Sequence, residues 1–531
     1  MRAFWTIAWV QLRGLLSATA GGARRTGQRR SAVAILAAMV GFSLYLSFTY
    51  SWALASMLRA SETTDLILVM MPLFGVVGSV LVGAQGAAGF IFGGRDNDLL
   101  LSLPVSRLLL SLAKLTALFA DSMVMMLGIC LPAGAVYALQ ARTNPLYWPF
   151  LIVGTVMLSL LATALGALVG LALSAFRPQG GAAVVANLAS LALLLAIVAG
   201  LMVGQQALLA RLISDPSALR ATLRAWAAPF YWFRNAVLDE SWLHLGLVAL
   251  AGLVPFTLVA AVLARNFLRI TSALAARAPA VRAVELTELR ARSPFRALVA
   301  KEARRFFGTS SYVLNCGISP ALALVGGGYL LATRQIPPPL VQAAVAAGGT
   351  PLFLISAALI MICALGSTTA PSISLEGDRL WVLREAPLAA RTILDAKVAF
   401  NLLVLLPPVA FAVLAGAVVS GAGPLEAVLA FAAPAATGVF AAELGLVSNL
   451  AWPKLDAAND TLAIKQSASV LIAFLGTMAV AGTALGVSMA AAPRLGTTGA
   501  LLIVLAIVSV PILVLRLVLA GWGIRTFARL A

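Results

Sequence analysis

Long apolar stretches, each of roughly twenty residues or more, follow one another along most of the 531-residue chain. A helix of about 20 apolar residues crosses the ~30 Å hydrocarbon core of a bilayer. A transmembrane β-barrel would instead need segments of about ten residues with alternating polarity, which the sequence lacks. Lipid leaves every backbone N–H and C=O to be satisfied within the protein, so the stretches predict an all-α integral membrane protein.

Composition points the same way. Hydrophobic residues make up 61% of the chain and charged residues 11%, whereas a soluble chain of this length needs far more charge to cover its surface. The 37 basic and 19 acidic residues give a net charge of +18. We attribute this excess to cytoplasmic loops near anionic lipid. Nucleic acid is not an expected partner, because no basic stretch carries interleaved aromatic residues or a recognisable reader motif.

The apolar stretches predict about twelve transmembrane helices. Trp5, Trp9, Leu12 and Leu16 recur at helical spacing before the first of them, which predicts an amphipathic interfacial helix at 4–16. The spans are expected at 31–57, 66–92, 108–139, 147–175, 181–204, 243–268, 312–332, 347–373, 393–420, 425–450, 465–490 and 499–522.

Basic residues predict the orientation, because cytoplasmic loops of membrane proteins are rich in Lys and Arg. The segment before the first span, the stretch 265–305 and the C-terminal segment are all basic. We therefore expect a multi-pass protein of the cell membrane, bacterial inner or plasma, with both termini in the cytoplasm. One loop runs against this rule: 205–241 should be external, yet it contains Arg211, Arg220, Arg224 and Arg234.

Three segments of the first half of the chain recur in the same order in the second half. The matched pairs are 4–16 with 295–307, 94–114 with 377–397, and 170–178 with 445–453. Each pair occupies the same place in a six-span half, so we predict a duplication. Both halves then share one orientation, which makes them parallel, pseudo-symmetric six-helix repeats, each preceded by an amphipathic interfacial helix, at 4–16 and 295–307. The predicted division is a first half at 1–270, a cytoplasmic linker at 271–294 and a second half at 295–531.

The second matched pair forms a charged elbow between the second and third spans of each half. A Pro ends each elbow, and Lys114 and Lys397 follow in the next span, where we expect them to snorkel to the interface. A short rigid helix of this kind is suited to being pushed by a soluble partner; the alternative is an interfacial anchor without a partner. The candidate residues are Arg95, Asp96, Asp98 and Pro104 in the first elbow, and Glu376, Gly377, Asp378, Arg379, Arg384, Glu385 and Pro387 in the second.

The elbow sequences DNDLLLSLPVSRLLLSLAK (96–114) and SLEGDRLWVLREAPLAARTILDAK (374–397) resemble those of the membrane domain of type 2 ABC exporters. The segments 452–474 and 229–238 are similar to two connections in such permeases. The resemblance implies an exporter permease whose elbows at 94–104 and 377–387 dock into ATP-binding cassette ATPase subunits. Two features depart from the pattern: the halves are fused, and the second half has no counterpart of the external segment 205–241.

No GxxxxGK[ST] phosphate loop occurs in the chain. The chain is therefore not expected to be an enzyme or to hold a cofactor; the resemblance implies that ATP and Mg are bound by the partner subunit. The single histidine, His244, and the scattered Cys130, Cys316 and Cys363 offer no metal-ligand spacing.

Two carboxylates, Asp121 and Glu443, are expected inside spans. A carboxylate in a span is costly, so each either faces a functional cavity or is paired or protonated between helices. Arg516 is expected to snorkel. Two other functions stay open: an ion-coupled secondary transporter with two parallel six-helix halves, and a non-transporting scaffold subunit. Neither the substrate nor the direction of transport follows from the sequence.

Overall fold

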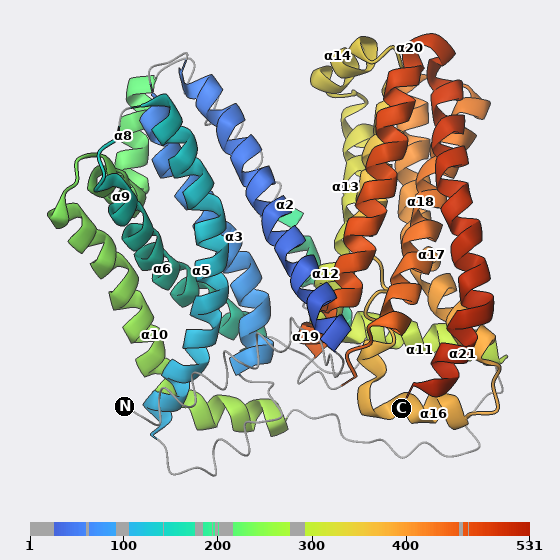
Figure 1. The fold of residues 1–531 in the computed structure, drawn as a ribbon, viewed down its shortest axis with the longest axis horizontal. Coiled ribbons are helices and arrows are strands. Elements are labelled where there is room, and N and C mark those ends of the chain that lie inside the picture. The colour runs from blue at the N-terminus through green and yellow to red at the C-terminus, as the bar shows by residue number, and fades with distance from the viewer. Residues whose placement is uncertain are drawn as a thin grey trace. The chain divides into compact units, whose positions relative to one another are not determined.

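The computed structural model describes residues 26–59, 63–91, 106–141, 143–175, 184–193, 195–196, 200, 216–276, 293–455, 460–465 and 467–530. Every regular element within these residues is a helix. The predicted all-α membrane fold is thereby confirmed (Figure 1). The predicted interfacial helix at 4–16 and most of the first elbow lie outside the described residues. The described helices form two compact units.

Unit 1 holds the described helices between residues 26 and 276, apart from Val184–Leu193. Its elements are α2 (Thr26–Arg59), η1 (Thr64–Leu66), α3 (Ile67–Ile91), α5 (Arg107–Gln140), α6 (Tyr147–Ala175), α8 (Pro216–Trp226), α9 (Ala228–Leu238) and α10 (Trp242–Ala276). The helices α3 and α6 pack along each other and approach closely at Gly83 and Gly166, where the helices carry no side chain. Tyr147 Oη donates to the Gly134 carbonyl at 2.9 Å, which fixes the connection between α5 and α6.

The basic segment that opposed the predicted orientation is partly neutralised within unit 1. Asp65, at the start of the α3 span, accepts from Arg220 Nη2 of α8 at 2.9 Å and from Arg234 Nε of α9 at 3.1 Å. Phe230 and Phe233 of α9 are buried in the core of the unit. The described part of the segment, 216–241, is therefore a pair of packed helices tied to the bundle by one carboxylate, which is a fixed counter-ion for Arg220 and Arg234.

Unit 2 contains Val184–Leu193 and the described residues from 293 onward. Its helices are α11 (Pro294–Gly308), α12 (Ser310–Cys316), α13 (Ile318–Thr333), α14 (Pro338–Ala346), α15 (Pro351–Ala364), η3 (Ser374–Arg379), α16 (Leu380–Glu385), α17 (Ala390–Ser420), α18 (Pro424–Ala451), α19 (Asp460–Lys465), α20 (Ala468–Val518), η4 (Leu519–Gly523) and α21 (Ile524–Arg529). Figure 1 places α14 at one end of this unit and α11, α16 and α21 at the opposite end, the elbow end.

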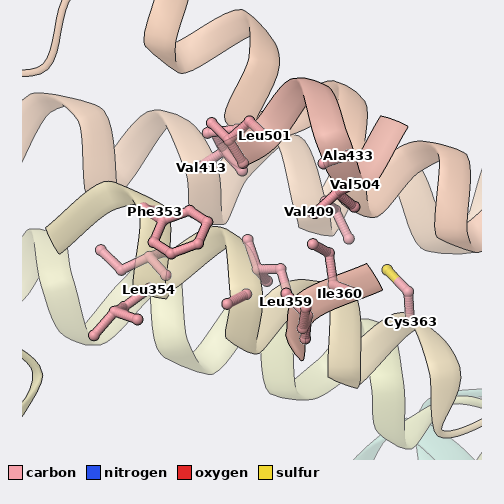
Figure 2. Close-up of a cluster of buried hydrophobic side chains, with 14 of the residues drawn as sticks. Phe353, Leu354, Leu359, Ile360, Cys363, Val409, Val413, Ala433, Leu501 and Val504 are labelled. Carbon is pink, nitrogen blue, oxygen red and sulfur yellow. The ribbon is translucent and has the colours of Figure 1, made fainter. Parts of the chain in front are cut away.

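The core of unit 2 lies between α15, α17, α18 and α20 (Figure 2). Phe353 and Ile360 of α15 face Val409 of α17 and Val504 of α20, and all four side chains are fully buried. Small residues such as Ala433 of α18 let these helices approach closely. The same unit also buries polar side chains around residues 366–374, at the elbow end of this core.

Three predicted segments of unit 2 differ from the structure. The span expected at 347–373 is helical only over Pro351–Ala364. Asn401 of α17 and Asn449 of α18 form hydrogen bonds with the non-helical backbone that follows. The span expected at 312–332 is bent by 55° at Gly317. The connection between the spans expected at 465–490 and 499–522 is tighter than expected: residues 491–498 remain helical except at Gly496, whose φ of 64° reverses the chain.

Seven described helices are long and apolar enough to cross a membrane, or up to nine if each bent pair is one span. One of these elements, Ala468–Arg529, is 62 residues long. At about 1.5 Å per residue such a length far exceeds the ~30 Å core, so the break at Gly496 divides it into two crossings. The spans expected at 108–139, 393–420 and 425–450 agree with α5, α17 and α18 within three residues.

Candidate coupling site at the elbow of unit 2

The elbow of the second half joins α15 to α17 at the elbow end of unit 2 (Figure 1). The chain leaves α15 at Ala364, forms η3 and the short helix α16, and enters α17 at Ala390. Within η3, Gly377 has a φ of 53° and a ψ of −136°, a conformation that favours glycine. A Cβ there would also lie 3.3 Å from the Leu455 carbonyl oxygen. Gly377 therefore allows the tight turn that separates the buried part of the elbow from its exposed helix.

A buried ion cluster holds this elbow to α11 and α17. Lys397 Nζ of α17 lies 2.6 Å from Glu302 Oε1 of α11 and 2.9 Å from Glu376 Oε1 of the elbow. The same ammonium donates to the Ser372 carbonyl at 3.2 Å. Its three donors therefore reach α11 and two points of the elbow, and its side chain is only 2% exposed.

Two further cations of α11 complete the cluster around Glu376. Lys301 Nζ forms an ion pair with Glu376, and Arg305 Nη1 lies 3.4 Å from Glu376 Oε2. Arg305 Nη2 also donates to the Leu375 carbonyl. With Lys397 and Glu302, the cluster has three basic and two acidic side chains, and it links α11, the elbow and α17.

The cluster keeps Glu376 ionised. Burial alone would raise the pKa of this carboxyl, but the charges of Lys397 and Lys301, and the hydrogen bonds both donate, lower its pKa to about 2. The pKa of Lys301 is lowered by burial and by the neighbouring Lys397 charge. A charged Glu376 at neutral pH is thus a fixed part of the elbow, and breaking its pairs would leave a buried carboxylate without compensation.

The opposite face of the elbow is exposed. Leu380 and Leu383 of α16 are buried in the core of the unit, whereas Trp381 and Val382 are 61% and 51% exposed. Charged residues surround this apolar pair on the surface; they are Asp378, Arg379, Arg384 and Glu385, with Pro387 exposed just after the helix. A central aromatic residue with a charged rim is typical of a protein docking surface.

The structure separates the sequence-predicted elbow residues into two groups. Glu376 is buried in the ion cluster, and Gly377 forms the turn after it. Asp378, Arg379, Arg384, Glu385 and Pro387 are exposed, and Arg384 Nη1 also donates to the Leu530 carbonyl at the end of α21. The corresponding residues of the first elbow, Arg95, Asp96, Asp98 and Pro104, lie outside the described residues.

The prediction that Lys114 and Lys397 snorkel to the interface is wrong. Their exposed fractions are 1% and 2%, and Lys397 is held by two carboxylates inside the unit. Each lysine lies seven residues after the first residue of its helix, α5 or α17 (114 − 107 and 397 − 390). This equal placement is what a duplication predicts, although the boundaries of the two halves remain a prediction.

The two carboxylates expected inside spans have different surroundings. Glu443 of α18 is fully buried, and Arg516 Nε of α20 forms an ion pair with it. Arg516 Nη1 also lies 3.2 Å from Asp395 Oδ1 of α17. Arg516 therefore ties three helices together while its side chain stays 46% exposed, so its expected snorkelling remains a prediction, and Glu443 matches the paired alternative. Asp121 is exposed on α5 of unit 1.

Sequence reasoning missed Lys301, Glu302 and Arg305 as partners of the elbow. They are charged positions of an amphipathic helix, which are ordinarily solvated. Lys301 and Arg305 reach Glu376 across 75 and 71 residues of chain, and Glu302 reaches Lys397 across 95. The available signal was the recurrence of the lysine at equivalent places in both halves. The exposed Trp381 and Val382 were also missed, because an apolar pair in an apolar chain does not stand out.

A family model described as a membrane protein of 12 TMs matches residues 30–520 of the chain. The chain belongs to this family. A search of curated proteins and a search of solved structures each found no match. Membership of the twelve-span family confirms a multi-pass membrane protein. The family description names neither a substrate nor a partner.

Proposed function

We propose that the chain is the membrane-spanning permease subunit of an ABC exporter, moved by a separate ATP-binding subunit. In this proposal α16 is the coupling helix of the second half, and the first elbow supplies the equivalent helix of the first half. Both termini and both elbows face the cytoplasm of a bacterial inner or plasma membrane, as the basic loops predict. ATP and Mg are bound by the partner.

One observation carries the proposal: α16 exposes Trp381 and Val382, whereas η3, directly before it, is held to α17 by the buried ion pair of Glu376 and Lys397. A partner that engages the exposed pair therefore pushes on a segment that cannot tilt independently of α11 and α17. An anchor in the interface, the other interpretation of the elbow, needs no such internal attachment. The ion cluster converts a push on the elbow into movement of the spanning helix α17.

The proposal is tested by substituting the exposed apolar pair. The full chain is purified from its native membranes in a mild detergent, and vanadate-sensitive ATP hydrolysis in the preparation is measured. Trp381→Ala should lower the co-purified activity about tenfold, because a central aromatic anchor contributes about 1–2 kcal/mol or more at an interface. Val418→Ala is the matched control, since Val418 is 74% exposed near the other end of α17.

Charge reversal provides a second arm. Glu385→Arg changes an exposed residue of α16, and we expect a smaller loss that grows at low salt, because rim charges act mainly on association. Reversal of the charge at Glu376 is unsuitable as a test, because it would break the ion pairs of the buried cluster and destabilise the fold. Absence of vanadate-sensitive hydrolysis from the unaltered chain, or equal activity in Trp381→Ala, would overturn the proposal.

A further inference from the structure

The one histidine of the chain lies at a corner of unit 1, where α9 ends and α10 begins. Asp239, Glu240 and Ser241 form the turn between these two helices. Glu240 has a φ of 48°, a left-handed conformation that is uncommon for residues other than glycine. His244 follows in the first turn of α10, and its side chain is half-buried. The ring therefore contacts both solvent and the neighbouring side chains.

A chain of hydrogen bonds runs from this ring to a guanidinium of α9. Arg234 Nη1 donates to Asn235 Oδ1 at 2.8 Å, and Asn235 Nδ2 lies 3.4 Å from His244 Nε2. On the other side of the ring, His244 Nδ1 lies 2.9 Å from Ser241 Oγ. Because Arg234 Nε also donates to Asp65 at 3.1 Å, the chain continues to the carboxylate that holds α8 and α9.

These partners select one protonation state of the ring. A guanidinium can only donate hydrogen bonds, so the Asn235 atom next to Arg234 is the amide oxygen and the NH₂ group faces Nε2. Nε2 must then accept, which leaves Nδ1 as the nitrogen that carries the single proton of a neutral ring. Nδ1 donates to Ser241 Oγ, which also accepts from the backbone N–H of His244 at 3.5 Å. The hydrogen bonds thus fit a neutral His244 with its proton on Nδ1.

A second proton on the ring does not fit this arrangement. An imidazolium donates from both nitrogens, so its Nε2–H would face the NH₂ group of Asn235. Turning the amide around would offer its oxygen to the ring but would set the NH₂ group against the guanidinium of Arg234. Asn235 can therefore satisfy only one of the two cations. The added charge is also repelled by Arg234, which contacts the same amide.

The surrounding charges leave one carboxylate to receive a protonated ring. The other titratable or charged groups described at this corner are Asp65 of η1, Tyr137 of α5, Tyr147 of α6, Arg220 of α8, Arg234 of α9, and Asp239 and Glu240 of the turn. Asp65 is paired with two arginines, and Asp239 lies 3.9 Å from Arg234. Glu240 is the one carboxylate of this corner without an arginine partner among the described residues. A counter-ion for the imidazolium would therefore come from the turn itself.

We propose that Arg234, Asn235 and His244 form a proton-sensitive device, the histidine latch, which closes the turn between α9 and α10. The latch is closed when His244 is neutral and opens when the ring is protonated. Imidazole is the side chain that gains a proton between about pH 8 and about pH 5, so the latch opens as the pH falls through this range. Opening removes one attachment of α9, and with it of α8, to α10.

The predicted orientation places 205–241 outside the cell, so the latch would respond to the external pH. This inference goes beyond the proposed function, because it involves neither an ATPase nor a transported substrate. Every residue of the latch belongs to unit 1, whereas the coupling site belongs to unit 2. Failure of one proposal is therefore distinguishable from failure of the other.

The single histidine allows the protonation state to be measured directly. The full chain is produced with ¹³C,¹⁵N-labelled histidine, purified through a tag that contains no histidine, and studied by solid-state NMR in lipid. At about pH 8 the ring nitrogen without a proton should be Nε2, and at about pH 5 both nitrogens should carry protons. A proton on Nε2 at the higher pH, or a ring still neutral at the lower pH, would refute the latch.

Opening of the turn is measured by hydrogen–deuterium exchange of the peptide 235–246, corrected for the effect of pH on intrinsic exchange. Its amides should exchange about tenfold faster at about pH 5 than at about pH 8, as expected for the loss of about one hydrogen bond. Peptides of α6 are the internal control and should show no such change. His244→Gln keeps a donor and an acceptor on a side chain that does not titrate, so the pH effect should vanish.

Asn235→Asp provides the opposite case. A carboxylate accepts from both Arg234 and a protonated His244, so the turn should stay closed at about pH 5 and Nε2 should carry a proton at a higher pH than in the unaltered chain. An equal pH effect on exchange in the unaltered chain and in His244→Gln would refute the latch and leave His244 as a structural residue. The same conclusion would follow if Asn235→Asp opened at low pH like the unaltered chain.

Discussion

Lys397 Nζ and Glu376 Oε1 lie 2.9 Å apart in the interior of unit 2, although 21 residues separate them in the chain. This contact joins the start of a spanning helix to the root of the elbow that precedes it. Glu302 adds a second carboxylate from α11 at 2.6 Å from the same ammonium. The three side chains give the elbow a fixed position relative to two helices.

Removing the lysine should destabilise unit 2 strongly. In Lys397→Met, Glu302 and Glu376 stay buried without their shared cation, and breaking a buried pair in this way costs about 3–5 kcal/mol. The midpoint of thermal unfolding in detergent should fall clearly, while Arg391→Met, at a residue 75% exposed, should change it little. A double variant that adds Glu302→Gln should recover part of the loss. Equal midpoints for Lys397→Met and Arg391→Met would contradict the attachment.

Acid should weaken the same attachment. The folded pKa of Glu376, about 2, is lower than its ordinary value of 4.5, so its contribution is complete above pH 4.5 and is lost as the pH falls toward 2. A difference of this size corresponds to about 3 kcal/mol. The unfolding midpoint of the unaltered chain should therefore drop between pH 6 and pH 3 by more than that of Glu376→Gln. Parallel curves for the two proteins would show that Glu376 is not the titrating group.

Asp65 should hold the helix pair α8–α9 to unit 1. Asp65→Ala leaves Arg220 and Arg234 without their common carboxylate, at a cost of about 1 kcal/mol for a partly exposed pair. Limited tryptic cleavage within α8 should become several-fold faster. Asp239→Ala serves as the comparison, because Asp239 is 56% exposed and lies 3.9 Å from Arg234. Identical cleavage rates in both variants would rule out a special role for Asp65.

The ion pair of Glu443 and Arg516 decides between two roles for the buried carboxylate. If the pair is structural, Arg516→Leu should lower the unfolding midpoint and Glu443→Gln in the same chain should restore most of it, because a neutral amide is cheaper to bury than an unpaired carboxylate. Under the proposed function, the vanadate-sensitive ATP hydrolysis that co-purifies with the double variant should remain close to that of the unaltered chain. Loss of this activity with full recovery of stability would instead give Glu443 a functional role.

The sequence by itself determined the class of fold, the positions of most spans and the place of the second elbow. Apolar length fixes these features, because a spanning helix depends on its own residues and the thickness of the bilayer. The starts of α17 and α18 agree with the predictions within three residues. The elbow could also be recognised from the sequence, because its charged residues and Pro387 lie together in one short stretch of the chain.

Only the tertiary structure decided which charged residues face inward. Glu376 and Glu385 read alike in the sequence, yet one is buried among cations of α11 and α17 and the other is exposed. The end of the α15 helix at Ala364 was equally hidden, because Asn401 and Asn449 satisfy the following backbone from helices more than 30 residues away. Burial and hydrogen bonding of this kind arise between helices that the chain separates, so no local pattern records them.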